Sequence, residues 1–198
     1  MIQRSLRLAL TFLLVSAAFC SASQISDILV SLCDPAKLAT LHERGANPRV
    51  QKIVYWLETG RLEGQSPKEL MDETMSRLGW NDERGQLTTA AMLRNLDIAT
   101  KLGCTDEEGL ANMRHGKCAI VKAGPYGGDF LSVDHIVPRA HYPQLDNVLA
   151  NLELMPMKLN RAKSDKMGQR QEYELGLFQS AGLISKLPVP ALVPVAGP

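Results

Sequence analysis

Residues 130–163 predict two short strands followed by a helix, and this order constrains the fold more than any other part of the chain. Residues 130–137 and 152–155 are short apolar segments of the kind found in strands. Pro156 then stands where a helix can begin, and the following positions predict a helix that continues beyond Met167. Residues 118–121 are a further strand candidate. We therefore expect a small unit of strands and a helix at residues 117–186.

Residues 24–116, in contrast, predict a mainly helical region. Residues 25–32 and 51–57 carry apolar side chains at helical spacing. Capping patterns mark three further helix starts, at Ser66, Thr89 and Thr105, for helices over residues 67–78, 90–102 and 106–114. Gly103 is expected to end the second of these helices. Four glycines and Pro125 between residues 116 and 128 then predict turns, and the whole chain is expected to be an α+β protein.

The first 23 residues have the pattern of a secretory signal peptide. Two arginines precede an apolar run at residues 8–19, and small residues follow at 20–23. The run is shorter than the about 20 residues that a transmembrane helix needs. We expect cleavage near residue 22 or 23 and a secreted or periplasmic protein with no stable membrane association. An uncleaved anchor and a lipoprotein attached through Cys20 are the alternatives.

The composition permits nucleic-acid binding only through a local basic patch. Hydrophobic residues make up 45% and charged residues 22% of the chain, as in ordinary globular proteins. Cleavage after residue 23 removes two arginines and no acid, so the formal charge changes from +1 to −1. Aromatic residues make up only 5%, so no stacking platform for single strands is expected.

Three cysteines remain beyond residue 23, and in an oxidising compartment they allow one disulfide and one free thiol. Cys104 and Cys118 are the nearest pair and flank the short helix expected over residues 106–114. A disulfide between them fits the spacing, which leaves the pairing open. Because no C-x-x-C occurs, no structural zinc is expected.

Asp134 and His135 stand side by side in the apolar segment 130–137 and suggest a chemistry. A carboxylate is a hard ligand suited to Mg²⁺ or Mn²⁺, and a neutral imidazole can take a proton from water near neutral pH. Asn160, early on the helix after Pro156, could add a side-chain oxygen to the same cation. Singly, the three residues have ordinary alternatives: a turn cap, a hydrogen-bonded histidine in a strand, and an exposed helix residue.

Together these residues carry a resemblance to a known family. Residues 130–170 resemble the active site of the HNH (ββα-metal) endonucleases. The resemblance is carried by three segments: Asp-His-Ile-Val-Pro from residue 134, Asn-Leu-Glu-Leu-Met beginning sixteen residues after His135, and Leu-Asn-Arg-Ala-Lys from residue 159. The resemblance implies that Asp134 and Asn160 bind the metal and that His135 activates water. Asn where many members have a final His indicates the H-N-N variant, which favours Mg²⁺ or Mn²⁺.

The middle asparagine of the motif, Asn151, belongs by this resemblance to the catalytic group. We expect it to hydrogen-bond to the backbone and to hold the His135 segment in shape. A local turn or cap is the competing interpretation, and Asn147 is a lesser candidate for the same task.

Basic residues follow the motif and could bind phosphates. Between residues 158 and 170 only Asp165 is acidic, and Arg139 follows the strand that ends near His135. On one helix such residues could follow a phosphate backbone, although a solvated basic face is the ordinary alternative. The expected nucleic-acid-binding residues are Arg139, Lys158, Arg161, Lys163, Lys166 and Arg170.

These observations predict an exported, magnesium- or manganese-dependent endonuclease that hydrolyses DNA, with RNA left open as a second substrate and with low sequence specificity. Two other classes remain: a non-catalytic nucleic-acid-binding protein on the same scaffold, and an exported interaction protein whose helical region dominates. Residues 187–198 contain four prolines and are expected to form an extended tail.

Overall fold

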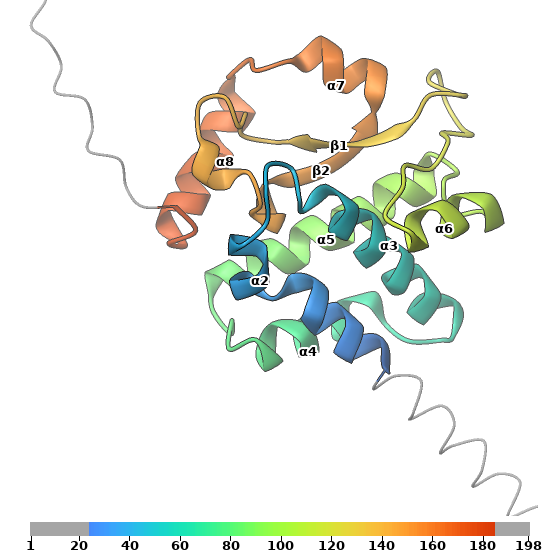
Figure 1. Cartoon of the computed structure of the whole chain (residues 1–198), viewed down its shortest axis with the longest axis horizontal. Coiled ribbons are helices and arrows are strands. Elements are labelled where there is room, and N and C mark those ends of the chain that lie inside the picture. The colour runs from blue at the N-terminus through green and yellow to red at the C-terminus, as the bar shows by residue number, and fades with distance from the viewer. Residues whose placement is uncertain (1–23, 185–198) are drawn as a thin grey trace, which may run out of the picture.

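The computed structural model describes residues 24–184 of the chain (Figure 1). Helices account for 58% of the structure, and the strands form a single two-stranded antiparallel sheet within the described residues. The protein is thus a mixed, mainly helical structure with a small sheet, as the α+β prediction requires. The signal peptide predicted at residues 1–23 and the tail predicted at residues 187–198 lie outside the described residues.

The helical region contains the helices that the sequence predicted, with different starts for two of them. Its elements are helical residues 24–33, α2 (Pro35–Ala39), α3 (Asn47–Leu62), α4 (Pro67–Arg77), α5 (Glu83–Lys101) and α6 (Glu107–Arg114). Ser66 caps α4 as predicted, because its Oγ accepts a hydrogen bond from the Glu69 amide at 3.4 Å. Gly103, with φ of 67°, follows the end of α5 as predicted.

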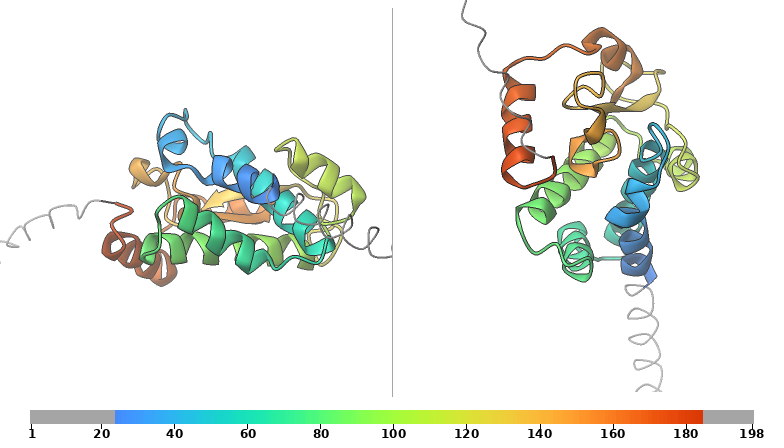
Figure 2. Two further views of the ribbon diagram at one scale, coloured as in Figure 1. Left: turned by 90° about the horizontal axis from the view of Figure 1, so that it is seen from below. Right: turned by 60° about the vertical axis from the view of Figure 1, so that its left-hand side comes forward.

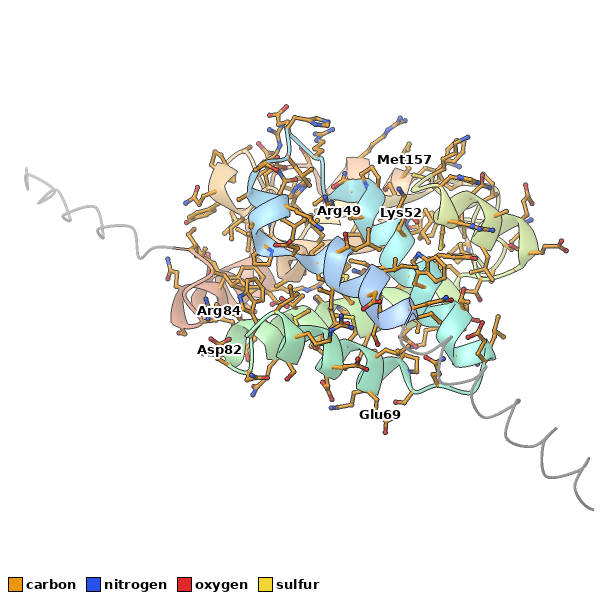
Figure 3. All side chains as sticks on the ribbon, turned by 60° about the horizontal axis from the view of Figure 1, so that its bottom comes forward. Arg49, Lys52, Glu69, Asp82, Arg84 and Met157 are labelled. Carbon is orange, nitrogen blue, oxygen red and sulfur yellow. The ribbon has the colours of Figure 1, made fainter. Side chains whose placement is uncertain are left out.

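Two predicted helix caps were wrong. Helix α5 begins well before Thr89, which is buried inside it, and its N-cap is Asp82 (Figure 3). The Asp82 carboxylate accepts a hydrogen bond from the Arg84 amide at 3.1 Å. At α6 the cap is Asp106 rather than Thr105, and it accepts from the Gly109 amide at 2.9 Å. In both cases an aspartate, which caps at least as well as threonine, takes the role.

The sheet pairs β1 (Leu131–His135) with β2 (Leu152–Pro156) in antiparallel register, with His135 opposite Leu152. A long connection with two short 3-10 turns, Pro143–Leu145 and Leu149–Asn151, joins the strands. The strand expected at residues 118–121 is not a strand. Only Ile120 forms an isolated bridge, to Phe130, because the glycine-rich turn begins directly afterwards and leaves no length for a ladder.

Helix α7 (Met157–Lys163) begins after Pro156, as predicted, but it ends at Lys163 rather than beyond Met167. The reason is Ser164, whose φ of 54° lies outside the helical region and turns the chain away. A separate helix, α8 (Gln169–Ser180), follows. In Figure 1, α7 lies on one side of the strands and the long helices α3 and α5 lie on the other.

One hydrophobic core joins the helical region to the sheet, since it includes Leu29, Ile53 and Met92 together with Leu131 and Leu154. This core continues across residue 116, where the sequence predicts the boundary between the helical region and the unit at residues 117–186. A second, smaller cluster packs the connection between the strands against Phe178 of α8. None of the described helices is long and apolar enough to cross a membrane.

Two buried amides attach α3 and α5 to the sheet, and the left view of Figure 2 looks at the strands from the side of these helices. Gln51 of α3 donates through Nε2 to the Leu131 carbonyl at 2.9 Å. Asn95 of α5 donates to the Leu152 carbonyl at 2.9 Å and accepts from the Leu154 amide at 2.7 Å. These bonds satisfy strand groups that would otherwise be buried without partners.

The disulfide that the spacing allowed between Cys104 and Cys118 is absent, and all three described cysteines are free thiols. The Cys104 thiol is buried and donates to the Ile120 carbonyl at 3.5 Å. Burial raises the pKa of the Cys104 thiol to about 11 and that of Cys33 to about 12. Both thiols are therefore protonated at neutral pH and behave as small apolar side chains.

Candidate active site

One cavity of about 700 Å³ is lined by five of the ten site residues that the sequence predicted. Asp134 and His135 at the end of β1 line it, as do Asn160 and Arg161 of α7. Its opposite wall comes from the helical region. The lining residues contributed by that region are Arg44, Asn47, Pro48, Gln51 and Gly116.

His135 is buried, and one of its ring nitrogens is held firmly. Nε2 lies 3.0 Å from the backbone oxygen and 3.0 Å from Oδ1 of Asp146. Both partners are acceptors when the carboxylate is ionised, so Nε2 carries a proton and the lone pair of the neutral ring is on Nδ1. Among the described residues Nδ1 has no hydrogen-bond partner, so His135 is held in a tautomer that can accept a proton there.

Asp134 is buried beside a lysine. Its Oδ2 lies 2.8 Å from Nζ of Lys163, which also donates to the His135 carbonyl at 2.7 Å. Burial raises the pKa of the Asp134 carboxyl group, and the hydrogen bond and charge of Lys163 oppose that rise. Lys163, which the sequence predicts to contact phosphate, is in this structure the local positive charge that compensates Asp134.

Asn160 is held against β1 through its side-chain amide nitrogen. Its Nδ2 donates to Ser132 Oγ at 3.1 Å and to the Val133 carbonyl at 3.2 Å. Since a carbonyl only accepts, the amide nitrogen must face β1, and Oδ1 remains available for a ligand.

Asp134 and Asn160 therefore supply two hard oxygen donors on adjoining elements. This set fits a hydrated Mg²⁺ or Mn²⁺, which commonly binds through one or two protein oxygens and completes its coordination with water and substrate phosphate. Within residues 24–184 no group of three or more His, Cys, Asp or Glu side chains is placed to hold a metal ion.

Asn151 is completely buried and does not line the cavity. Its Oδ1 accepts from the Val137 amide at 2.8 Å, and its Nδ2 donates to the carbonyls of Val137 and Leu145 at 3.0 and 3.2 Å. The expected hydrogen bonds to the backbone are therefore present, and they hold the chain that follows His135. Asn147 holds a different segment, since its Oδ1 accepts from the Ala46 amide at 2.9 Å.

The six basic residues do not form one row. Three of them are paired with carboxylates: Arg139 with Glu43, Lys163 with Asp134 and Arg170 with Glu153. The expectation that the residues after Pro156 share one helix was wrong, because α7 ends at Lys163 and α8 begins at Gln169. The other three of the six, Lys158, Arg161 and Lys166, have side chains that make no ion pair or hydrogen bond with any described residue.

Glu153 explains why Arg170 is engaged. It lies directly opposite Asp134 in the β1–β2 register, and both carboxylates are buried. Like charges in this arrangement repel, so each needs its own cation. Arg170 makes two hydrogen bonds to Glu153, at 2.5 and 3.0 Å, and Arg94 of α5 lies 3.1 Å from the same carboxylate.

Sequence reasoning missed two residues that belong to this site, Asp146 and Arg44. Asp146 was visible as an acid between the two halves of the motif, but its contact with His135 depends on how the connection between the strands folds. Arg44 lies far from the motif in sequence. No protein-family model, curated protein or solved structure matches the chain.

Proposed function

We propose that this protein is an exported endonuclease that hydrolyses phosphodiester bonds of DNA with the help of a divalent cation and with low sequence specificity. The observation that supports this most is the state of His135, whose Nε2 is held by Asp146 while Nδ1 is left to accept a proton. It lines the same cavity as Asp134 and Asn160. The resemblance to HNH endonucleases and the order β1, β2, α7 support the same conclusion.

Each residue of the site has a role in this proposal. Nδ1 of His135 takes a proton from the attacking water, and Asp146 keeps the ring in the required tautomer. Asp134 and Oδ1 of Asn160 would hold Mg²⁺ or Mn²⁺, which when bound stabilises negative charge on the phosphate. Arg161 binds the phosphate from α7, and Asn151 keeps the backbone after β1 in place.

Water as the nucleophile makes DNA a sufficient substrate, because no ribose 2′-hydroxyl takes part in the reaction. RNA has the same phosphodiester and is a chemically competent second substrate. The proposal of export to the periplasm or the medium depends on residues 1–23, whose sequence resembles a signal peptide.

The test is cleavage of supercoiled plasmid by protein that begins at residue 24, with Mg²⁺, with Mn²⁺ and with a chelator. We expect nicked or linear products that require the cation and that disappear in His135→Ala. His115→Ala is the matched control, because His115 is also a histidine but lies exposed at the end of α6. Equal cleavage by His135→Ala and the wild type would show that His135 is not the base.

A specific contact favours a second candidate, a nucleic-acid-binding protein without catalytic activity. Because Lys163 already compensates the Asp134 carboxylate at 2.8 Å, the site is electrostatically satisfied by protein groups. This candidate predicts that the wild type binds oligonucleotides equally with and without a cation and never cleaves them. Metal-dependent nicking in the plasmid assay would exclude it.

A further inference from the structure

The cavity has two walls that come from different parts of the chain. Helix α7 and the residue after it supply one wall, with Asn160, Arg161 and Ser164. The loop between α2 and α3, residues 40–46, and the start of α3 supply the other, with Arg44 and Asn47. The helical region is therefore part of the cavity that contains His135.

Backbone conformation singles out one residue on each wall. Among the described residues other than glycine, only Arg44 and Ser164 have positive φ, at 56° and 54°. This conformation costs free energy for residues with a Cβ, and such residues cluster where structure serves a site. Both line the cavity, one on each wall.

The α2–α3 loop is held in this position by the connection between the strands. The Arg44 amide donates to Oδ2 of Asp146 at 2.9 Å, while Oδ1 of the same carboxylate lies 3.0 Å from His135 Nε2. Asn147 accepts from the Ala46 amide and donates to the carbonyls of Leu41 and His42, at 3.3 and 3.2 Å. Asp146 and Asn147 thus hold the loop that carries Arg44, and Asp146 also holds the ring of His135.

The side chain of Arg44 is exposed and has no partner among the described residues, in contrast to its backbone. Arg161 on the facing wall is likewise exposed and without a partner there. The neighbouring cations Arg139 and Lys163 are paired with carboxylates. Two guanidinium groups are therefore available on opposite walls, and guanidinium binds phosphate oxygens through paired hydrogen bonds.

We propose that the helical region clamps the nucleic-acid strand through Arg44, which binds a backbone phosphate across the cavity from Arg161. This inference rests on the proposed function, because it assumes that the cavity receives nucleic acid. It gives the helical region a task that the motif alone does not: to form the second wall of the substrate site.

The test uses Arg44→Gly in a His135→Ala background, so that substrate is bound but not cleaved. Glycine adopts positive φ without strain and keeps the amide that Asp146 accepts from, so the variant removes the guanidinium and retains the loop. Binding of a labelled duplex and of a labelled single strand is followed by fluorescence anisotropy over a series of salt concentrations, in the presence of a chelator.

Each phosphate contact contributes about 0.9 to the slope of log affinity against log salt for duplex DNA and about 0.7 for a single strand. We expect Arg44→Gly to lower the slope by about that amount and to weaken binding, and Arg44→Lys to restore the slope. Lys68→Gln is the control of equal charge change, because Lys68 is exposed on α4 and does not line the cavity. Equal slopes for Arg44→Gly and its parent would overturn the clamp.

The clamp and the nuclease can fail separately. If the wild type cleaves plasmid and Arg44→Gly in the His135→Ala background binds with the same affinity and salt slope as its parent, the clamp is wrong and the nuclease stands. If the wild type never cleaves but Arg44→Gly lowers the salt slope, the clamp stands without catalysis. If inorganic phosphate binds with the same dependence on Arg44 while neither oligonucleotide binds, the site takes a free anion and the clamp is wrong.

Discussion

His135 owes its tautomer to Asp146, which lies eleven residues further along the chain. Without the carboxylate, the ring would keep only the backbone oxygen of Asp146 as a partner for Nε2. At the scale of single residues, the orientation of the proposed base therefore depends on the side chain of Asp146. The same carboxylate accepts from the Arg44 amide, so a change at Asp146 also affects the loop before α3.

Asp134 has a raised pKa, caused first by burial and opposed by Lys163, and this predicts how stability depends on pH. A carboxyl group with a raised pKa in the folded state stabilises the fold while it is protonated, below its unfolded pKa of about 3.9. That contribution is lost as pH rises through the folded pKa. At neutral pH the ionised carboxylate therefore costs free energy in the folded protein.

We accordingly expect metal-free Asp134→Asn to have a higher free energy of unfolding than the wild type at pH 7, and the difference to shrink as the pH is lowered toward 4. Lys163 keeps its hydrogen bond to the His135 carbonyl in this variant. Urea denaturation in the presence of a chelator measures the effect. Asp72→Asn, at an exposed carboxylate on α4, should show no such gain. A less stable Asp134→Asn at pH 7 would mean that the pair with Lys163 outweighs burial.

At the scale of elements, the chain after α7 contains a basic residue that is paired with a buried carboxylate, Arg170, and one that is exposed, Lys166. Arg170 at the start of α8 binds the buried Glu153, so Arg170→Ala should destabilise the fold, by about 1–2 kcal/mol. Removing one partner of a buried ion pair costs about 3–5 kcal/mol when the other charge is left uncompensated, but here Arg94 remains beside Glu153. Lys166→Ala, at an exposed side chain between α7 and α8, should change stability by less than about 0.5 kcal/mol.

Thermal or urea unfolding of both variants, together with the salt dependence of oligonucleotide binding, measures this difference. If Arg170→Ala were as stable as the wild type and bound DNA more weakly with a lower salt slope, Arg170 would contact phosphate as the sequence predicted. The pairing observed with Glu153 would then be broken when substrate binds.

At the scale of the whole molecule, Asn95 attaches α5 to the sheet, and the shared core decides whether the two regions unfold together. Asn95→Ala would leave the Leu152 carbonyl and the Leu154 amide buried without partners, at about 1–3 kcal/mol each. We expect a loss of about 2–4 kcal/mol, with α3 and β1 still unfolding in one transition because they share a core. Hydrogen exchange of amides in α3 and β1 measures both effects, and Asn112→Ala on α6 is the control. Separate transitions would show that the helical region is an independent folding unit.

Local patterns predicted the elements well wherever a few neighbouring residues decide them. The capping box at Ser66 and the helix start after Pro156 are formed by side chains and backbone groups within one turn, so both could be read from the chain. The same reasoning gave the wrong cap for α5, because Asp82 and Thr89 are both competent caps and packing decides between them. The strand expected at residues 118–121 was wrong, because the glycine-rich turn leaves room for a single bridge between Ile120 and Phe130.

The sequence by itself determined the helical character of residues 24–116, the β1, β2, α7 order and the motif of Asp134, His135, Asn151 and Asn160, because these depend on short-range spacing. Only the tertiary structure brought Asp146 to His135 and Arg44 to the cavity, and only it assigned Lys163 and Arg170 to buried carboxylates. The contact between the Arg44 amide and Asp146 joins residues 102 positions apart. Such contacts follow from the shared core that closes the chain on itself, and no local pattern of residues encodes which distant side chains that core will bring together.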